Sequence, residues 1–236
     1  MSPTYTRVRH AAARSAAVAA LLALTATHAA AQPEAGARDP QVVRMDSARI
    51  RSLYVSNRHE DHPPADYARQ MTAKRRTDSV YAARSAGVME FRKVTYKSRA
   101  DGMTIPAYLF APLTKRGAKG HAAMIWVHGG VHGDWGTSMF PFVREAVQRG
   151  YVIITPDYRG STGHGEAHHK AIDYGGKEVD DVISAVDYLK TLPYVDQDRL
   201  GMMGWSHGGF ITAHTLFRGG NEFKARSEER RVGKEC

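Results

Sequence analysis

The sequence has almost no cysteine: of its 236 residues only the last, Cys236, is one. Internal disulfides, a cysteine nucleophile and a thiolate metal centre are therefore excluded for the rest of the chain. Long hydrophobic runs are also missing, since the apolar stretch within residues 1–31 is shorter than the roughly 20 residues that cross a bilayer. With 42% hydrophobic and 24% charged residues, the composition is that of a globular protein and excludes a collagen-like or multi-span membrane chain.

Acidic residues are absent from residues 1–31, which carry three basic ones, Arg7, Arg9 and Arg14. An apolar, alanine-rich run follows and ends in small residues at Ala31. This pattern predicts a cleavable secretory signal peptide, with cleavage after Ala31. The protein is therefore expected to be secreted or periplasmic, without stable membrane anchoring. An uncleaved anchor helix is the alternative.

The last eleven residues, 226–236, match the in-frame translation of a common sequencing adapter. We expect this tail to be an artefact that interrupts the natural sequence near Ala225. A solvated charged tail is the alternative. The first 31 residues contribute three positive charges and the tail a net one, which leaves +5 of the formal +9. No stripe of alternating basic and aromatic residues accompanies this mild excess, so a nucleic-acid partner is not expected.

Between these two ends the pattern changes near residue 89. Residues 32–88 read as a polar N-terminal extension that is partly helical. Residues 89–225 alternate strands and helices, which predicts a mostly parallel sheet with helices on both faces. The expected strands are 90–98 and 104–111, joined as a hairpin, then 124–127, 151–155 and 200–205. The expected helices are 140–148, one helix over 179–189 that Pro193 closes, and 210–217.

The most informative motif is the run from Gly204 to Gly209, Gly-Trp-Ser-His-Gly-Gly, between an expected strand and an expected helix. That context is the one required of a Gly-x-Ser-x-Gly nucleophile elbow. Ser206 is the candidate nucleophile. The backbone N–H of His207, at the start of the helix, is the candidate donor to an oxyanion. An ordinary turn between strand and helix is the alternative.

A second motif, His128-Gly129-Gly130, follows an expected strand. Acyl-transfer hydrolases place their other oxyanion donor at this point. We expect the Gly130 N–H to be that donor, with Gly129 as its nearest rival, while an ordinary loop is the alternative.

These motifs, together with the run from Asp157 to Gly163 (Asp-Tyr-Arg-Gly-Ser-Thr-Gly), make residues 94–218 resemble the catalytic domain of prolyl oligopeptidase family serine peptidases. The resemblance implies a doubly wound, mostly parallel α/β-hydrolase fold with only its first five strands present. It also implies hydrolysis of peptides through an acyl-enzyme on Ser206. Residues 32–88 are too few for the β-propeller of large family members. A carboxylesterase, or a non-catalytic binding protein on the same scaffold, therefore remains an alternative.

The superfamily order is nucleophile, acid, histidine. No aspartate follows Ser206, and the only later histidines are His207 and His214. His207 adjoins the serine and His214 lies two helical turns further on, so neither is a credible general base. The chain as written is expected to be inactive. We also expect it to aggregate, because the fifth strand would be an exposed edge.

Other polar groups are expected to be structural. Asp180 and Asp181 read as solvated carboxylates on a helix, while Asp157 and Arg159 are expected to pair and brace a loop. Neither a metal nor another cofactor is expected, although histidines of the loops leave a metal site as an alternative. The glycines near residue 160 fit no nucleotide-binding motif. The expected partner is a peptide or small acyl substrate, and the oligomeric state is left open. Histidines that fall in or beside the loops are His128, His132, His164, His168, His169 and His207.

Overall fold

The computed structural model describes residues 47–55, 58, 64–115, 120–218 and 222–229. The expected signal peptide and the tail beyond residue 229 lie outside the described residues. All described residues belong to one compact unit, Val43–Cys236. No helix within them has both the length and the apolar character needed to pass through a bilayer.

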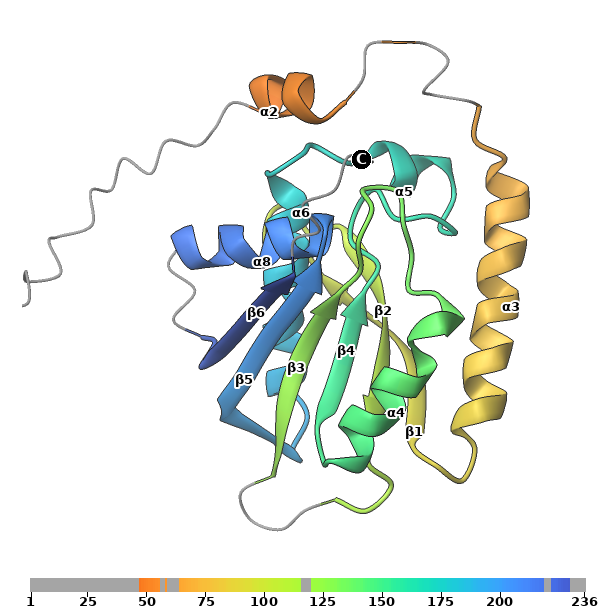
Figure 1. Ribbon diagram of the computed structural model, residues 1–236, viewed down its shortest axis with the longest axis vertical. Coiled ribbons are helices and arrows are strands. Elements are labelled where there is room, and N and C mark those ends of the chain that lie inside the picture. The colour runs from red at the N-terminus through yellow and green to blue at the C-terminus, as the bar shows by residue number, and fades with distance from the viewer. Residues whose placement is uncertain (1–46, 56–57, 59–63, 116–119, 219–221, 230–236) are drawn as a thin grey trace, which may run out of the picture. The chain divides into compact units, whose positions relative to one another are not determined.

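The core of the fold is a six-stranded sheet in the order β1-β2-β4-β3-β5-β6 (Figure 1). The antiparallel pairs are β1 with β2 and β2 with β4, whereas β3 runs parallel to β4 and β5, and β5 runs parallel to β6. The predicted hairpin and mostly parallel sheet are therefore confirmed. The strands are β1 Glu90–Lys97, β2 Thr104–Ala111, β3 His121–Val127, β4 Val152–Pro156, β5 Val195–Trp205 and β6 Ala225–Glu229.

Helices cover both faces of the sheet. Successive side chains of a strand point to opposite faces, and apolar side chains on each face pack against helices. Ile154 of β4 packs into the cluster with α6, α7 and α8, while its neighbour Ile153 packs into the cluster with α3 and α4. The helices are α2 Ser47–Tyr54, α3 Tyr67–Ser85, the 3-10 turn η2 Thr137–Met139, α4 Phe140–Gln148, α5 Glu166–Lys170, α6 Lys177–Ile183, α7 Ala185–Lys190 and α8 His207–Phe217.

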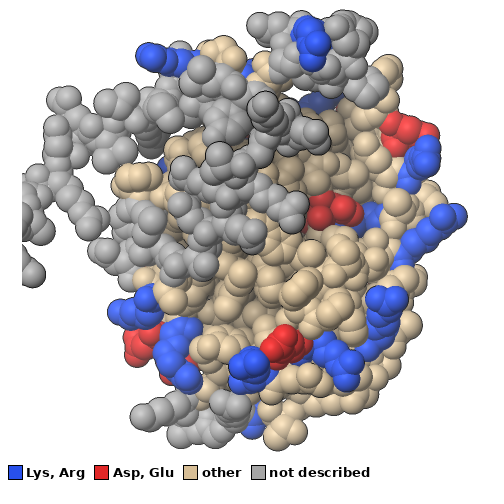
Figure 2. Space-filling model, viewed as in Figure 1, with Lys and Arg blue, Asp and Glu red and all other residues tan. Residues whose placement is uncertain are grey.

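Helix α3 lies in the segment read as an extension, yet it contributes to the core. Tyr81 is fully buried against Phe110 and Phe140, and its hydroxyl donates to the Gly136 carbonyl at 2.8 Å. The outer side of α3 is basic, and Lys and Arg side chains line that edge of the molecule in Figure 2. The compact unit thus begins before residue 89.

Two elements differ from the sequence-based expectation. Ala225–Glu229 pairs with β5, so β5 has a neighbour on each side and is not the edge strand that we expected. The sheet accordingly has six described strands rather than five, because ladder pairing needs only backbone groups. The helix expected over 179–189 is broken at Ser184, whose hydroxyl donates to the Asp180 carbonyl at 2.5 Å and accepts from the Arg99 N–H at 2.8 Å. Such a local bond competes with the regular helix ladder.

Candidate active site

Ser206 stands alone between β5 and α8, with an exposed side chain and a left-handed backbone, φ 54°. The glycines two residues before and after it are sterically required. A Cβ on Gly204 would lie 2.5 Å from the Gly208 carbonyl, and one on Gly208 would lie 2.4 Å from the Val127 carbonyl oxygen. The structure therefore has the strained turn of a nucleophile elbow. The chemical role of Ser206 stays a prediction.

The His128–Gly130 loop lies directly against this elbow. A Cβ on Gly129 would be 2.9 Å from Trp205 Cδ1 and 3.2 Å from Ser206 Cβ. Gly130 has φ 75°, and its carbonyl accepts from the Tyr158 hydroxyl at 2.9 Å and from the Gly133 N–H at 3.0 Å. These two bonds fix the peptide plane of the loop next to Ser206.

The two predicted oxyanion donors are the backbone N–H groups of Gly130 and His207. Neither has a hydrogen-bond acceptor among the residues that the structure describes. Free N–H groups beside an exposed serine can donate to a developing oxyanion. The geometry is compatible with both predicted roles.

The His207 side chain is buried, with its ring 5.3 Å from that of Phe210 and 5.8 Å from that of Tyr158. Its Nε2 lies 3.8 Å from Glu178 Oε1. Burial lowers the pKa of His207 to about 4, so the imidazole is neutral at pH 7. Because the ring packs among these groups, His207 can serve the serine only through its backbone.

The other later histidine, His214, packs against Phe210 on α8, and the centroids of the two rings lie 4.2 Å apart. Within the described part of the chain, no histidine forms a hydrogen bond to Ser206 Oγ. The described histidines that form side-chain hydrogen bonds have other partners.

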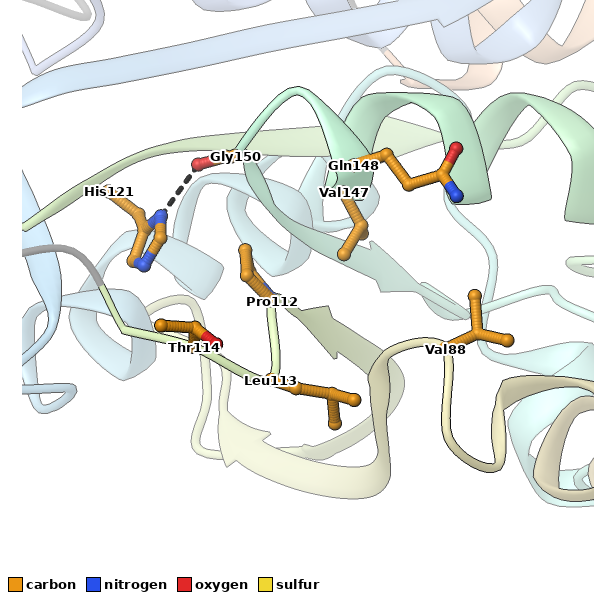
Figure 3. A pocket seen from close by; sticks show the side chains of 8 residues that line it. All are labelled: Val88, Pro112, Leu113, Thr114, His121, Val147, Gln148 and Gly150. Atoms are coloured by element: carbon orange, nitrogen blue, oxygen red, sulfur yellow. Dashed lines mark hydrogen bonds between the residues drawn. The ribbon is translucent and has the colours of Figure 1, made fainter.

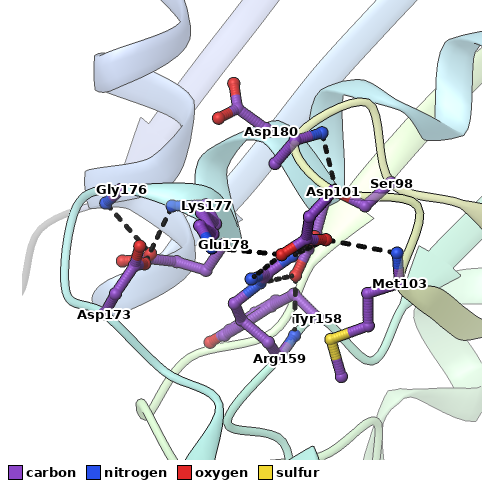
Figure 4. Close-up of polar contacts among 12 residues, drawn as sticks. Ser98, Asp101, Met103, Tyr158, Arg159, Asp173, Gly176, Lys177, Glu178 and Asp180 are labelled. Atoms are coloured by element: carbon purple, nitrogen blue, oxygen red, sulfur yellow. Dashed lines mark hydrogen bonds and ion pairs between the residues drawn. The ribbon is translucent and has the colours of Figure 1, made fainter.

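Glu178 was not predicted from the sequence. Its carboxyl group is fully buried and accepts the N–H group of Gly175. It also accepts the N–H group of Gly176 at 3.1 Å, and both Gly176 and Glu178 are labelled in Figure 4. Burial, reinforced by the neighbouring Asp173, raises the pKa of Glu178 to about 8. The only signal in the sequence was the glycine pair before α6, which leaves N–H groups free for a carboxylate.

Arg159 is the centre of a buried ion-pair network (Figure 4). Its Nε lies 2.8 Å from Asp181 Oδ2, and its NH1 lies 3.0 Å from Asp101 Oδ2. The expected pair of Arg159 with Asp157 is therefore wrong, and so is the solvated reading of Asp181, which is fully buried. Asp180 does lie near the surface, where it pairs with Arg218 at 2.9 Å. The short α6 presents Asp181, beside buried Val182, to the guanidinium.

Asp157 instead pairs with Lys74 of α3, whose Nζ lies 2.5 Å from Asp157 Oδ2. His164 Nε2 lies 2.8 Å from the same oxygen, and His168 Nε2 lies 3.1 Å from the Asp157 carbonyl oxygen. His132 stacks on His169 with ring centroids 3.8 Å apart. These loop histidines have structural partners, and the described residues contain no group of three side chains suited to hold a metal ion.

A small hollow lies at the opposite end of β3 from the serine (Figure 3). Its volume is about 300 Å³, and its lining includes Val88, Leu113 and His121. His121 is the first residue of β3 and its Nδ1 bonds the Gly150 carbonyl at 2.7 Å, whereas the elbow lies beyond the last residue, Val127. Open α/β sheets bind ligands at the carboxyl ends of their strands, so this hollow is not the substrate site.

Residues 138–232, which include the whole elbow, match the sequence model of the prolyl oligopeptidase family. The chain is similar to this family over that segment. Among curated proteins it is 35% identical over 135 residues to the uncharacterized peptidase YuxL of Bacillus subtilis. That alignment covers 56% of this chain but 20% of the relative, so the chain spans about a fifth of its length.

Solved structures of peptidases show the same fold. A puromycin-hydrolyzing peptidase of Mycobacterium tuberculosis superposes with a TM-score of 0.54 at 27% identity, over 59% of this chain and 22% of the other. An acylaminoacyl peptidase in complex with Z-Gly-Gly-Phe-chloromethyl ketone gives a TM-score of 0.52, at 27% identity and the same coverage of 59% and 22%. The predicted α/β-hydrolase fold and family resemblance are confirmed.

Proposed function

We propose that this chain supplies the nucleophile and the oxyanion hole of an exported serine peptidase. The observation that carries the proposal is the juxtaposition of Ser206, exposed and left-handed at the elbow, with the Gly129–Gly130 loop packed against it. Similarity to the prolyl oligopeptidase family over residues 138–232 and a neighbour solved with a peptide chloromethyl ketone support peptide substrates.

In the proposed reaction Ser206 Oγ attacks the carbonyl carbon of the scissile amide. The N–H groups of Gly130 and His207 donate to the oxyanion that forms. A histidine, oriented by an acid, takes the serine proton and returns it to the leaving amine. Water then hydrolyses the ester on Ser206 and regenerates the hydroxyl. The acid and histidine are expected from the natural sequence beyond the interruption near Ala225.

The test begins with the source DNA, read across the codon for Ala225. We expect the frame to continue and to encode an aspartate and then a histidine. The protein from that frame should appear in the exported fraction with a mass that begins at Gln32. A fluorophosphonate probe should label it on Ser206, and Ser206→Ala should remove the label.

Turnover separates the alternatives. A peptidase hydrolyses an aminoacyl or prolyl anilide, whereas fast ester hydrolysis with slow anilide hydrolysis would identify a carboxylesterase. A frame without the aspartate and histidine, together with no labelling, would identify a non-catalytic binding protein. Retention of the full-length N-terminus in the cell would contradict export alone.

A further inference from the structure

Lys74 is a buried cation on a helix that precedes the segment matched by the family model. Only 5% of this residue is exposed, and its ammonium lies 2.5 Å from Asp157 and 4.3 Å from the centre of the Tyr108 ring. The loop that follows β4, from Asp157 to Gly163, also packs on the aliphatic stem of Lys74, because a Cβ on Gly163 would lie 2.7 Å from Lys74 Cβ. Lys74 therefore contacts the loop through both its charge and its stem.

The helix does not depend on Lys74 for its attachment. Tyr81, further along α3, is fully buried and its hydroxyl bonds the Gly136 carbonyl. At the start of the helix, the Asp66 side chain accepts the Arg69 N–H at 2.9 Å. Removing the Lys74 charge should thus leave α3 in place.

Asp157 passes the contact on to the loop that holds Gly130. Its Oδ1 accepts the Trp135 N–H at 3.3 Å and lies 3.9 Å from His128 Nε2. The next residue, Tyr158, stacks on the His128 ring at 4.4 Å and donates its hydroxyl to the Gly130 carbonyl. Asp157 and Tyr158 therefore hold this loop at both of its ends.

The charge of Lys74 decides whether Asp157 can stay ionised in this place. Burial alone would raise the pKa of Asp157, but Lys74 and His164 hold it well below its usual range. A buried carboxylate without its cation is left uncompensated and is strongly unfavourable. Loss of the cation must therefore be relieved by protonation or by movement of the loop.

We propose that Lys74 is a positioning residue of the active site, whose ammonium fixes Asp157 and through it the loop from His128 to Trp135. This inference rests on the proposed function only for its catalytic consequence. The mechanical coupling from α3 to the Gly130 loop can be measured without catalysis.

The test is hydrogen–deuterium exchange of the Lys74→Met variant, made in the protein from the continued reading frame that is also used for fluorophosphonate labelling. Arg76→Met, at an exposed position two residues along the same helix, is the matched control. We expect amides of residues 128–135 to exchange at least about tenfold faster in Lys74→Met, with β3 and α8 unchanged. Equal exchange in the two variants, or a uniform increase over the domain, would overturn the proposal.

The neutral pair Lys74→Met with Asp157→Asn covers the case in which the single variant does not fold. It buries no unpaired charge, so it should fold. If Lys74 acts through Asp157, this pair should still loosen residues 128–135 relative to the unmodified protein, because the ion pair that fixes Asp157 is gone. Protection of that loop at the level of the unmodified protein would contradict the proposal. In catalysis, Lys74→Met should lower kcat with little change in KM, and Lys74→Arg should restore part of it.

Discussion

The two glycines around Ser206 show how little room the elbow leaves for a side chain. A methyl group on Gly208 would meet two backbone oxygens, those of Val127 at 2.4 Å and His128 at 2.7 Å. Backbone atoms of a central strand cannot move aside as a flexible side chain can. The identity of this residue is thus dictated by the packing of α8 on the end of β3.

Gly208→Ala should accordingly destabilise the protein by about 3 kcal/mol, at the upper end of overpacking costs. It should also slow fluorophosphonate labelling, because Ser206 and the His207 N–H shift with α8. Gly136→Ala is the control, since the nearest atom to its Cβ would be Ser138 Oγ at 3.9 Å. Urea unfolding measures the free energy of unfolding of both variants. Equal stability of the two variants would show that the elbow tolerates a methyl group.

Residues of the site differ in how far the sequence could reveal them. Ser206 and Gly130 follow from short-range spacing after strands, which one segment of sequence displays. Asp181 and Lys74 were missed because their partners are distant in the chain. A carboxylate on a helix reads as solvated until the fold brings a guanidinium to it, and only the three-dimensional structure shows this.

At the scale of elements, Arg159 joins three pieces of the fold. It follows β4, binds Asp101 in the turn between β1 and β2, and binds Asp181 on α6. Removing one partner of a buried ion pair leaves the other charge uncompensated. The network therefore holds the hairpin and α6 to the loop that carries Tyr158.

Asp181→Asn should cost about 3 kcal/mol of unfolding free energy, at the lower end for a broken buried pair. Its neighbour Asp180 offers a matched control, because it pairs with Arg218 near the surface, where an ion pair contributes at most about 1 kcal/mol. Chemical denaturation of Asp181→Asn and Asp180→Asn compares the two. A similar small loss in both would mean that Arg159 finds sufficient compensation in Asp101.

The elements themselves were largely predictable, because their hydrophobic periods are regular. The hairpin, the parallel strands and α4 follow from alternation and from apolar runs. Two features escaped this reasoning. Ser184 interrupts a continuous apolar period through its hydroxyl, and β6 has the sequence Ala-Arg-Ser-Glu-Glu, which lacks the aliphatic run of a buried parallel strand.

Across the whole molecule, two buried groups beside the elbow give opposite dependences of stability on pH. Burial lowers the pKa of His207 from 6.5 to about 4, so its contribution to stability falls as the pH drops through that range. Burial raises the pKa of Glu178 from 4.5 to about 8, so its contribution falls as the pH rises through that range. Between about pH 4.5 and 6.5 both groups titrate, and their opposite effects on the free energy of unfolding cancel.

Glu178→Gln should therefore become more stable relative to the unmodified protein as the pH rises from 5 to 8. The difference should grow by up to about 1.4 kcal/mol per pH unit, the value of one unit of pKa shift. Urea unfolding at several pH values measures it. Glu166→Gln, whose partner Lys170 lies on the surface, should show no such trend. A difference independent of pH would mean that Glu178 is already ionised in the folded protein.

The left-handed backbone of Ser206 carries a consequence for evolution. A side chain in that conformation is strained, and glycine would relieve the strain without any other rearrangement. Selection for stability alone would thus favour glycine here, so a serine at this turn lowers thermal stability in exchange for the nucleophilic role that we propose for it. Heat-adapted relatives that stay active would have to recover that loss at sites remote from the elbow.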